Sequence, residues 1–223
     1  MLKDLTEVGQ IVQNGVVFNP RNWETLAMES GSLLQAVDNL FMLLESRNID
    51  YVLVGGVAIL NYVEGRNTQD IDLIMALSDL SKVPEIVIKQ QTNPYFARGE
   101  FEGLQIDILL AKNPLFRLVQ QNYAVKQSFL EREITIATVE GLLLLKLYAL
   151  PSLYRQGDFV RVSVYENDIA TLLYTYRSDM DRILQILSRY VSEGDIVSVG
   201  EILDEIKRRI ERFKSGQEGD SGG

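Results

Sequence analysis

Three aspartates interrupt apolar, strand-like segments of the chain, and their spacing suits metal-dependent chemistry. Asp70 and Asp72 sit one residue apart in the stretch DIDLIM, and Asp107 lies between two isoleucines in LQIDILL. Side chains alternate across a strand, so Asp70 and Asp72 point to the same face, roughly 6–7 Å apart. Two such carboxylates repel each other in a dry site unless a cation lies between them. If the two strands are neighbours, Asp107 completes a ligand set for a hard cation that also grips phosphate.

The residue types that the chain lacks narrow this chemistry. It contains no cysteine and no histidine, which excludes thiolate zinc sites, Ser-His and Cys-His hydrolases, and a histidine base. A metal ion must therefore be held by oxygen, which favours Mg²⁺, Mn²⁺ or Ca²⁺. A simpler interpretation stays open, in which the D-x-D pair faces solvent on an edge strand and Asp107 is a lone surface residue.

Two glycines precede this acidic stretch, at the point where a predicted strand turns into a helix. Without Cβ atoms, Gly55 and Gly56 would let a phosphate approach the backbone at the start of the helix. A tight structural turn explains them equally well. The sequence contains neither a Walker A loop nor a G-x-G-x-x-G pattern, which argues against P-loop and Rossmann sites.

Charged residues of the second half suggest an anion site. Lys146 lies on an apolar helical stripe in VEGLLLLKLYALPSL, so its ammonium must either reach solvent or meet an anion such as a nucleotide phosphate. Asp168 is expected to open the next helix, where its alternative role is that of an N-cap. Arg66 and Arg155 either add positive charge to the same site or are solvated.

The hydrophobic pattern predicts the elements that must position these side chains. Strands are expected at residues 51–54, 70–75, 95–102, 104–111, 125–130 and 133–137, with a helix after Gly55, another at 78–90, and a hairpin turn at Gly103. From Thr138 onward the pattern is helical. We therefore expect an α+β protein with a mixed-sheet core and N-terminal helices over residues 1–137, a helical region over 138–215, and a disordered tail over 216–223.

The overall composition is that of a globular protein with an acidic surface. Apolar residues make up 46%, charged residues 24%, and the formal net charge is -9. Such a chain is a poor non-specific binder of nucleic acid. Neither a signal peptide nor a membrane-spanning apolar run is apparent. We expect a soluble, cytoplasmic protein with no membrane partner.

Several of these residues together resemble a known signature. The glycine pair with Ala58, followed by Arg66, Thr68 and the residues DIDL, resembles the motif of the nucleotidyltransferase superfamily, whose fold is that of DNA polymerase β. More narrowly, the pattern is similar to the AbiEii/AbiGii-type toxin branch, with its G-G-x-A helix and R-x-T-x-D-I-D-L strand. Lys146, Arg155 and Asp168 resemble the K…R…D pattern of that branch. Val57 departs from the family, which often has serine there, and Glu166-Asn167 departs from the lysine common in the toxin branch.

This resemblance implies a fold and a reaction. The fold would be a nucleotidyltransferase-like mixed sheet flanked by helices, with a C-terminal helical bundle. Asp70 and Asp72 would hold the Mg²⁺ or Mn²⁺ ions that bind an NTP, and Asp107 would complete the metal site and help to deprotonate the acceptor hydroxyl. Lys146 would contact the triphosphate and act with the three aspartates in catalysis. The expected nucleotide-binding residues are Gly55, Gly56, Arg66, Thr68, Lys146, Arg155 and Asp168.

The acceptor and the partners stay open at the level of sequence. The toxin branch implies an RNA or tRNA acceptor and an antitoxin protein as partner. A catalytically weak nucleotide sensor on the same fold is an alternative, and so is a small-molecule, antibiotic-type nucleotidyltransferase, whose cationic acceptor would suit an acidic chain. Basic residues in the last helix either contact RNA or form a solvated face; they are Lys207, Arg208, Arg209, Arg212 and Lys214.

Overall fold

A computed structural model describes residues 30–64, 68, 70–129 and 132–220 of the chain. The chain divides into two compact units between Gly141 and Leu142, a few residues beyond the expected change of character at Thr138. The first unit contains the β-sheet and the second is helical.

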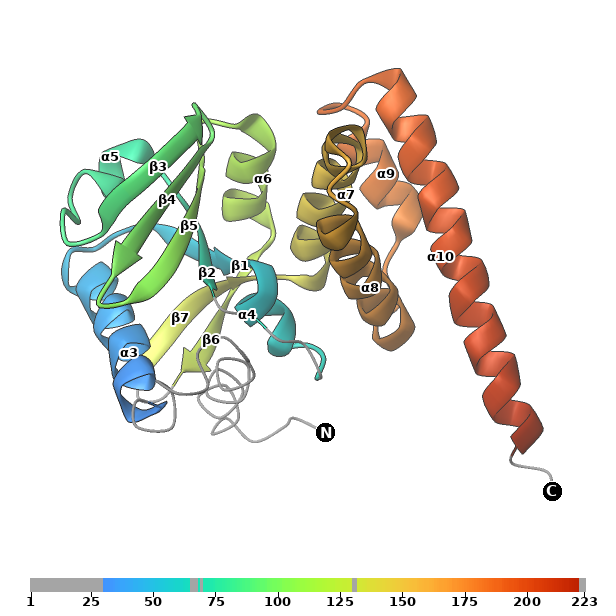
Figure 1. Cartoon of the computed structure of the whole chain (residues 1–223), viewed down its shortest axis with the longest axis horizontal. Coiled ribbons are helices and arrows are strands. Elements are labelled where there is room, and N and C mark those ends of the chain that lie inside the picture. The colour runs from blue at the N-terminus through green and yellow to red at the C-terminus, as the bar shows by residue number, and fades with distance from the viewer. Residues whose placement is uncertain (1–29, 65–67, 69, 130–131, 221–223) are drawn as a thin grey trace. The chain divides into compact units, whose positions relative to one another are not determined.

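The first unit is built on a seven-stranded mixed sheet with the strand order β3-β4-β5-β2-β1-β7-β6 (Figure 1). Two neighbouring pairs, β2 with β5 and β1 with β7, are parallel, and the other neighbours are antiparallel. The strands are β1 (Tyr51–Val54), β2 (Asp70–Met75), β3 (Val87–Asn93), β4 (Phe96–Phe101), β5 (Leu104–Leu110), β6 (Ala124–Phe129) and β7 (Arg132–Ala137). The mixed sheet and the C-terminal helices confirm the expected fold class.

The central strands are buried on both faces, which explains their continuous apolar sequences. All four residues of β1 are buried, and in β2 only Asp70 and Asp72 are partly exposed. Since β2 lies between β1 and β5, the two aspartates interrupt a central strand. The alternative interpretation of this pair as part of an edge strand is therefore wrong.

Helices α3 (Ser30–Ser46), α4 (Gly55–Leu60) and α6 (Pro114–Asn122) pack on this sheet. Helix α3 buries an apolar stripe at the helical spacing of three and four residues, formed by Val37, Leu40, Phe41 and Leu44. The ring of Phe41 stacks on Tyr51 of β1, with 5.8 Å between the centroids. Helix and strand thus share one core.

One element of the first unit differs from the sequence-based expectation. The helix predicted for residues 78–90 is wrong: only the four-residue α5 (Leu77–Leu80) is helical, and β3 begins at Val87. Pro84 cannot donate the backbone hydrogen bond that a continuing helix needs, and it disfavours helical geometry at the preceding residue. The β-branched residues that follow then pair with β4.

The second unit contains most of α7 (Val139–Gln156), together with α8 (Phe159–Thr175), α9 (Met180–Leu187) and α10 (Glu193–Asp220). Its core consists of fully buried aliphatic side chains, among them Leu143, Leu147, Leu150, Ile169, Leu172, Leu187, Val199 and Leu203. Helix α10 extends to Asp220 and so includes part of the segment for which the sequence suggests disorder. None of the helices in the described part of the chain is long and apolar enough to cross a membrane.

Candidate functional site

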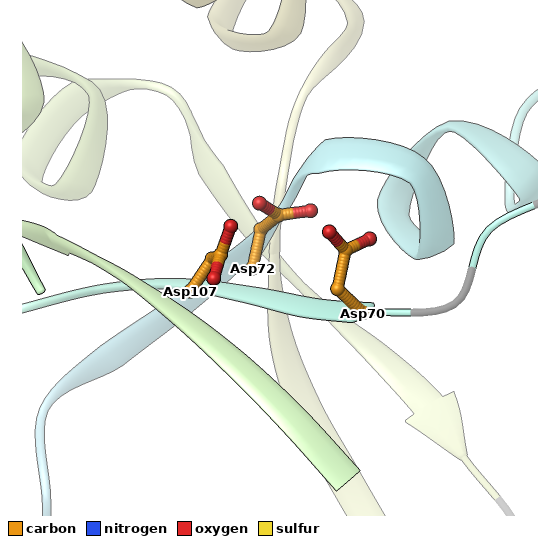
Figure 2. A group of neighbouring side chains, drawn as sticks. All are labelled: Asp70, Asp72 and Asp107. Atoms are coloured by element: carbon orange, nitrogen blue, oxygen red, sulfur yellow. The ribbon is translucent and has the colours of Figure 1, made fainter. Parts of the chain in front are cut away.

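Two adjacent parallel strands bring the three predicted aspartates together. Asp72 of β2 is paired in register with Asp107 of β5, and Asp70 lies two residues before Asp72 on the same face. One carboxylate oxygen from each residue lies within 4.8 Å of the other two (Figure 2). Asp107 is buried, whereas Asp70 and Asp72 are partly exposed. The donor set is all oxygen and fits a hard divalent cation such as Mg²⁺ or Mn²⁺.

Gly55 lies against the carboxylate of Asp72. Gly55 begins α4 directly after β1, whose last residue, Val54, is paired with Asp72. Its backbone has a φ of +67°, and a Cβ added there would lie 1.8 Å from Oδ2 of Asp72. Glycine is required twice here, once for the left-handed backbone and once for the space that Asp72 occupies. Gly56, the second predicted glycine, is buried in α4.

A buried hydroxyl contacts the first aspartate. Thr68 is 5% exposed, and its Oγ1 donates a hydrogen bond to Oδ1 of Asp70 at 3.2 Å. This contact orients the Asp70 carboxyl group. Arg66, predicted from the same sequence motif, lies outside the described residues.

The structure adds Arg98, a residue that sequence reasoning missed. Arg98 lies on β4 directly opposite Asp107. Its Nε donates to Oδ1 and its Nη2 to Oδ2 of Asp107, each at 2.6 Å. The pKa of the guanidinium is raised, chiefly by these hydrogen bonds and further by the charges of Asp107, Asp70 and Asp72, while burial acts in the opposite direction. Arg98 is thus the counter-ion of Asp107, the buried member of the acidic cluster.

The hairpin turn between β4 and β5 fixes this contact. Glu102 and Gly103 have φ values of 47° and 83°, as a two-residue turn with two left-handed positions requires. The turn pairs Phe101 with Leu104, and counting back along both strands pairs Arg98 with Asp107. The predicted hairpin at Gly103 is confirmed, and its register was the signal that could have identified Arg98.

The helical unit brings Lys146 of α7 and Asp168 of α8 together. Lys146 Nζ lies 2.7 Å from Oδ2 of Asp168, and both side chains are at most 6% exposed. The ammonium also lies 3.8 Å from the ring centroid of Tyr165. Lys146 therefore does not extend to solvent, and its anion in this structure is a carboxylate of the protein.

Asp168 does not open a helix, so that prediction and its N-cap alternative are wrong. Helix α8 begins earlier, at Phe159, and its N-cap is Asp158, whose side chain accepts a hydrogen bond from the backbone NH of Arg161 at 3.2 Å. Asp168 lies in the interior of α8 and is 3% exposed. A carboxylate buried there needs a partner, which Lys146 supplies.

Arg155 and Glu166 have partners within the same helical unit. The exposed Arg155 forms an ion pair with Asp195 in the first turn of α10, and this hydrogen bond is the main reason why the pKa of Asp195 is lowered. Glu166 accepts a hydrogen bond from the Tyr154 hydroxyl. Burial, and then this hydrogen bond, raise the pKa of Tyr154 to about 12. These contacts connect α7 with α8 and α10.

Comparison with known proteins gives weak structural likenesses. No protein-family model and no curated protein matches the sequence. Among solved structures, the chain is similar to an antigenic nucleotidyltransferase-like protein from Paracoccidioides brasiliensis, with 15% identity and a TM-score of 0.47 over 74% of this chain and 90% of that chain. It is also similar to ANT(2")-Ia in complex with adenylyl-2"-tobramycin, with 14% identity and a TM-score of 0.49 over 72% of this chain and 99% of that chain.

A solution structure of the antibiotic-resistance factor ANT(2'')-Ia is similar as well, with 12% identity and a TM-score of 0.43 over 83% of this chain and 98% of that chain. We therefore infer the function from the residues of this chain.

Proposed function

We propose that the protein is a metal-dependent nucleotidyltransferase, which moves an NMP from an NTP to an acceptor hydroxyl. The observation that carries this proposal is the convergence of Asp70, Asp72 and Asp107 on one face of two adjacent strands. Three carboxylates held this close repel one another strongly unless cations neutralise them. A site of this kind is useful for chemistry in which charge neutralisation and positioning supply most of the catalysis, as in phosphoryl transfer.

The residues have separate tasks in the proposed reaction. Asp70 and Asp72 would hold Mg²⁺ or Mn²⁺, with Asp107 as the third ligand. The bound metal would neutralise the triphosphate and polarise its phosphorus–oxygen bonds. Asp107 would accept the proton of the acceptor hydroxyl as the new oxygen–phosphorus bond forms at the α-phosphate and the bond to pyrophosphate breaks. Thr68 would keep Asp70 oriented, and Gly55 would leave room for Asp72.

The nucleotide contacts in this proposal come from the sequence resemblance. They are assigned to Gly55, Gly56, Arg66, Thr68, Lys146, Arg155 and Asp168. Lys146 is already paired with the carboxylate of Asp168. It would therefore contact a phosphate only if the phosphate displaced this carboxylate or bound to the ammonium beside it. Arg155 would likewise have to exchange Asp195 for the nucleotide.

The resemblance to the AbiEii/AbiGii-type toxin branch supports an RNA or tRNA acceptor and an antitoxin protein as partner. Exposed basic residues on α10 are the candidate contacts for such an acceptor; they include Lys207, Arg208, Arg209, Arg212 and Lys214. A cytoplasmic location fits a reaction that consumes an NTP. A small-molecule acceptor with positive charge is the alternative that the net charge of -9 favours.

A second candidate is a nucleotide sensor with little or no transfer activity. Its support is the Arg98 guanidinium, which engages both oxygens of Asp107, the residue that would otherwise accept a proton. Val57, at a position where serine is common in the superfamily, points in the same direction.

One experiment separates these candidates. The full chain is incubated with each labelled NTP, Mg²⁺, and total RNA, protein or aminoglycoside as acceptor. Transferase activity predicts label transfer to one acceptor class that is lost in Asp70→Asn and Asp72→Asn but retained in Arg132→Gln, a charge change elsewhere in the sheet unit. Binding of NTP without transfer to any acceptor favours the sensor. A chain that binds no NTP with or without Mg²⁺ contradicts both candidates.

A further inference from the structure

Arg98 and a divalent cation compete for the same negative charge. Its guanidinium forms a two-pronged, charge-assisted pair with Asp107. An oxygen of Asp107 lies within 4.8 Å of an oxygen of Asp70 and of Asp72, so this pair places a positive charge directly beside the candidate metal site.

The two cations cannot occupy this site without cost. Each carboxylate oxygen has a second lone pair, so Asp107 has room for another ligand. A divalent ion bound there would nevertheless lie within a few ångströms of the guanidinium, and like charges at that separation repel strongly in a partly buried site. Binding of the metal must therefore weaken the contact between Arg98 and Asp107.

Of the two partners, Arg98 is the one that can move. The side chain of Asp107 is 8% exposed and lies on β5, which has a neighbouring strand on each side, whereas that of Arg98 is 30% exposed. The guanidinium carbon lies 5.8 Å from the ring centroid of Phe96, two residues earlier on the same face of β4. A swing of the arginine away from Asp107 thus leaves the apolar core intact.

We propose that Arg98 is a built-in competitor of the metal at the site, which stabilises the carboxylate cluster in the metal-free protein and leaves Asp107 when a divalent cation binds. This inference rests on the proposed metal-dependent function, because it concerns the same three carboxylates. Arg98 acts here as a positioning residue through Asp107. When Arg98 leaves Asp107, both carboxylate oxygens of Asp107 would become available, so metal binding would be coupled to the freeing of these oxygens.

The first test measures Mn²⁺ affinity by calorimetry in the full chain without nucleotide. Arg98→Gln is expected to bind Mn²⁺ about tenfold more tightly than the wild type, because Mn²⁺ no longer has to break the charge-assisted pair between Arg98 and Asp107. Arg98→Lys keeps the charge but loses the two-pronged geometry, and its affinity is expected to lie between the two. Unchanged or weaker Mn²⁺ binding in Arg98→Gln overturns the proposal.

Arg132→Gln is the matched control. Arg132 also pairs with two carboxylates of the sheet unit, Asp38 at 2.9 Å and Glu45 at 3.0 Å, and its loss changes the net charge equally. Its Mn²⁺ affinity is expected to stay within about twofold of the wild type, because the charge is not part of the cluster. An equal gain of affinity in this control would show a general charge effect and would contradict the proposal.

A second test does not depend on a substitution at the site. The side-chain Nε–H of Arg98 is assigned in the nitrogen–proton NMR spectrum by its loss in Arg98→Lys, and Mg²⁺ is then added to the wild type. The signal is expected to shift with the same saturation curve as metal binding. A signal that stays in place while Mg²⁺ saturates the site overturns the proposal.

These tests separate the inference from the function on which it rests. If Asp70→Asn abolishes Mn²⁺ binding and NMP transfer, but Arg98→Gln does not tighten binding, only the inference fails. If Arg98→Gln binds Mn²⁺ more tightly and no acceptor is labelled, the inference stands and the transferase function fails. If neither the wild type nor Arg98→Gln binds Mn²⁺, both fail.

Discussion

Asp72 occupies the space in which a side chain on Gly55 would lie. A Cβ on Gly55 would fall 1.8 Å from Oδ2 and 2.7 Å from Cβ of the aspartate. The turn from β1 into α4 thus passes directly behind one of the three carboxylates. This contact gives the glycine a role in placing a metal ligand, whether or not its backbone also meets a phosphate.

Gly55→Ala is expected to damage both the fold and the cluster. The substitution adds a left-handed alanine, which costs about 1–2 kcal/mol, and an overlap with Asp72, which costs about 1–3 kcal/mol more. Chemical denaturation measures the loss of unfolding free energy. Calorimetry measures the accompanying loss of Mn²⁺ affinity, which follows because the Asp72 carboxylate must move.

Gly103→Ala provides the control for backbone strain alone. Gly103 has a φ of +83° in the β4–β5 turn, and nothing lies within 4 Å of the Cβ that alanine would add. Only the backbone strain of a left-handed alanine is expected there, which lowers the free energy of unfolding by about 1–2 kcal/mol and leaves the Mn²⁺ affinity unchanged. Equal losses of stability in the two variants would contradict the overlap of Gly55 with Asp72.

Thr68→Val is expected to weaken metal binding while leaving the fold nearly intact. Valine preserves the shape of the buried side chain but removes the hydroxyl that donates to Asp70. Residues that orient metal ligands typically contribute about 10–100-fold in affinity. Calorimetry with Mn²⁺ checks the expectation, and Thr68→Ser, which restores a hydroxyl, should recover most of the affinity. A serine variant as weak as the valine variant would argue against the hydrogen bond as the cause.

Lys146 and Asp168 are expected to depend on each other for stability. Lys146→Met leaves a carboxylate without its cation at a site where both side chains are at most 6% exposed, a change that costs about 3–5 kcal/mol. The double variant Lys146→Met with Asp168→Leu removes both charges and should regain most of this loss. Unfolding free energies of the two single variants and the double variant measure the coupling. Losses that simply add would show that the two residues act independently.

Because Tyr154 pairs with Glu166, the difference in stability between the wild type and Tyr154→Phe is expected to depend on pH. Burial and the hydrogen bond raise the pKa of Tyr154 to about 12 in the folded protein, whereas an unperturbed tyrosine titrates near about 10. The unfolded state therefore loses the proton first, and the stabilising contribution present below about pH 10 is lost as the pH rises toward about 12. The Tm advantage of the wild type over Tyr154→Phe should shrink across this range. A constant advantage would contradict the shifted pKa.

Sequence predicted the acidic cluster because each aspartate stands out within its own segment. A carboxylate in an apolar strand is visible without knowledge of the rest of the chain, and Asp107 joins Asp70 and Asp72 once two similar strands are assumed to be neighbours. Arg98 does not stand out, because an arginine on a partly exposed strand is ordinary. The role of Arg98 follows from the pairing of β4 with β5, and the register of that pairing is set by the turn at Gly103.

Other differences have local physical causes. The residues between 78 and 90 carry an apolar pattern that fits a helix as well as a strand, and Pro84 decides against the helix. Asp168 resembles a helix start because it precedes an apolar run, but its carboxylate is satisfied by Lys146, a residue on another helix. Such a partner becomes visible only when the two helices are packed.

The short loop between β4 and β5 also affects the order in which the sheet can assemble. Arg98 and Asp107 are nine residues apart in the chain, so their contact closes with little loss of chain entropy. The pairing of β2 with β5 joins Asp72 to Asp107 across a longer stretch of chain and is entropically more costly. A β4–β5 hairpin that forms before β2 pairs with β5 would bring Asp107 to the sheet with Arg98 already beside it. The charge of Asp107 would then be balanced when the carboxylates of Asp70 and Asp72 approach it.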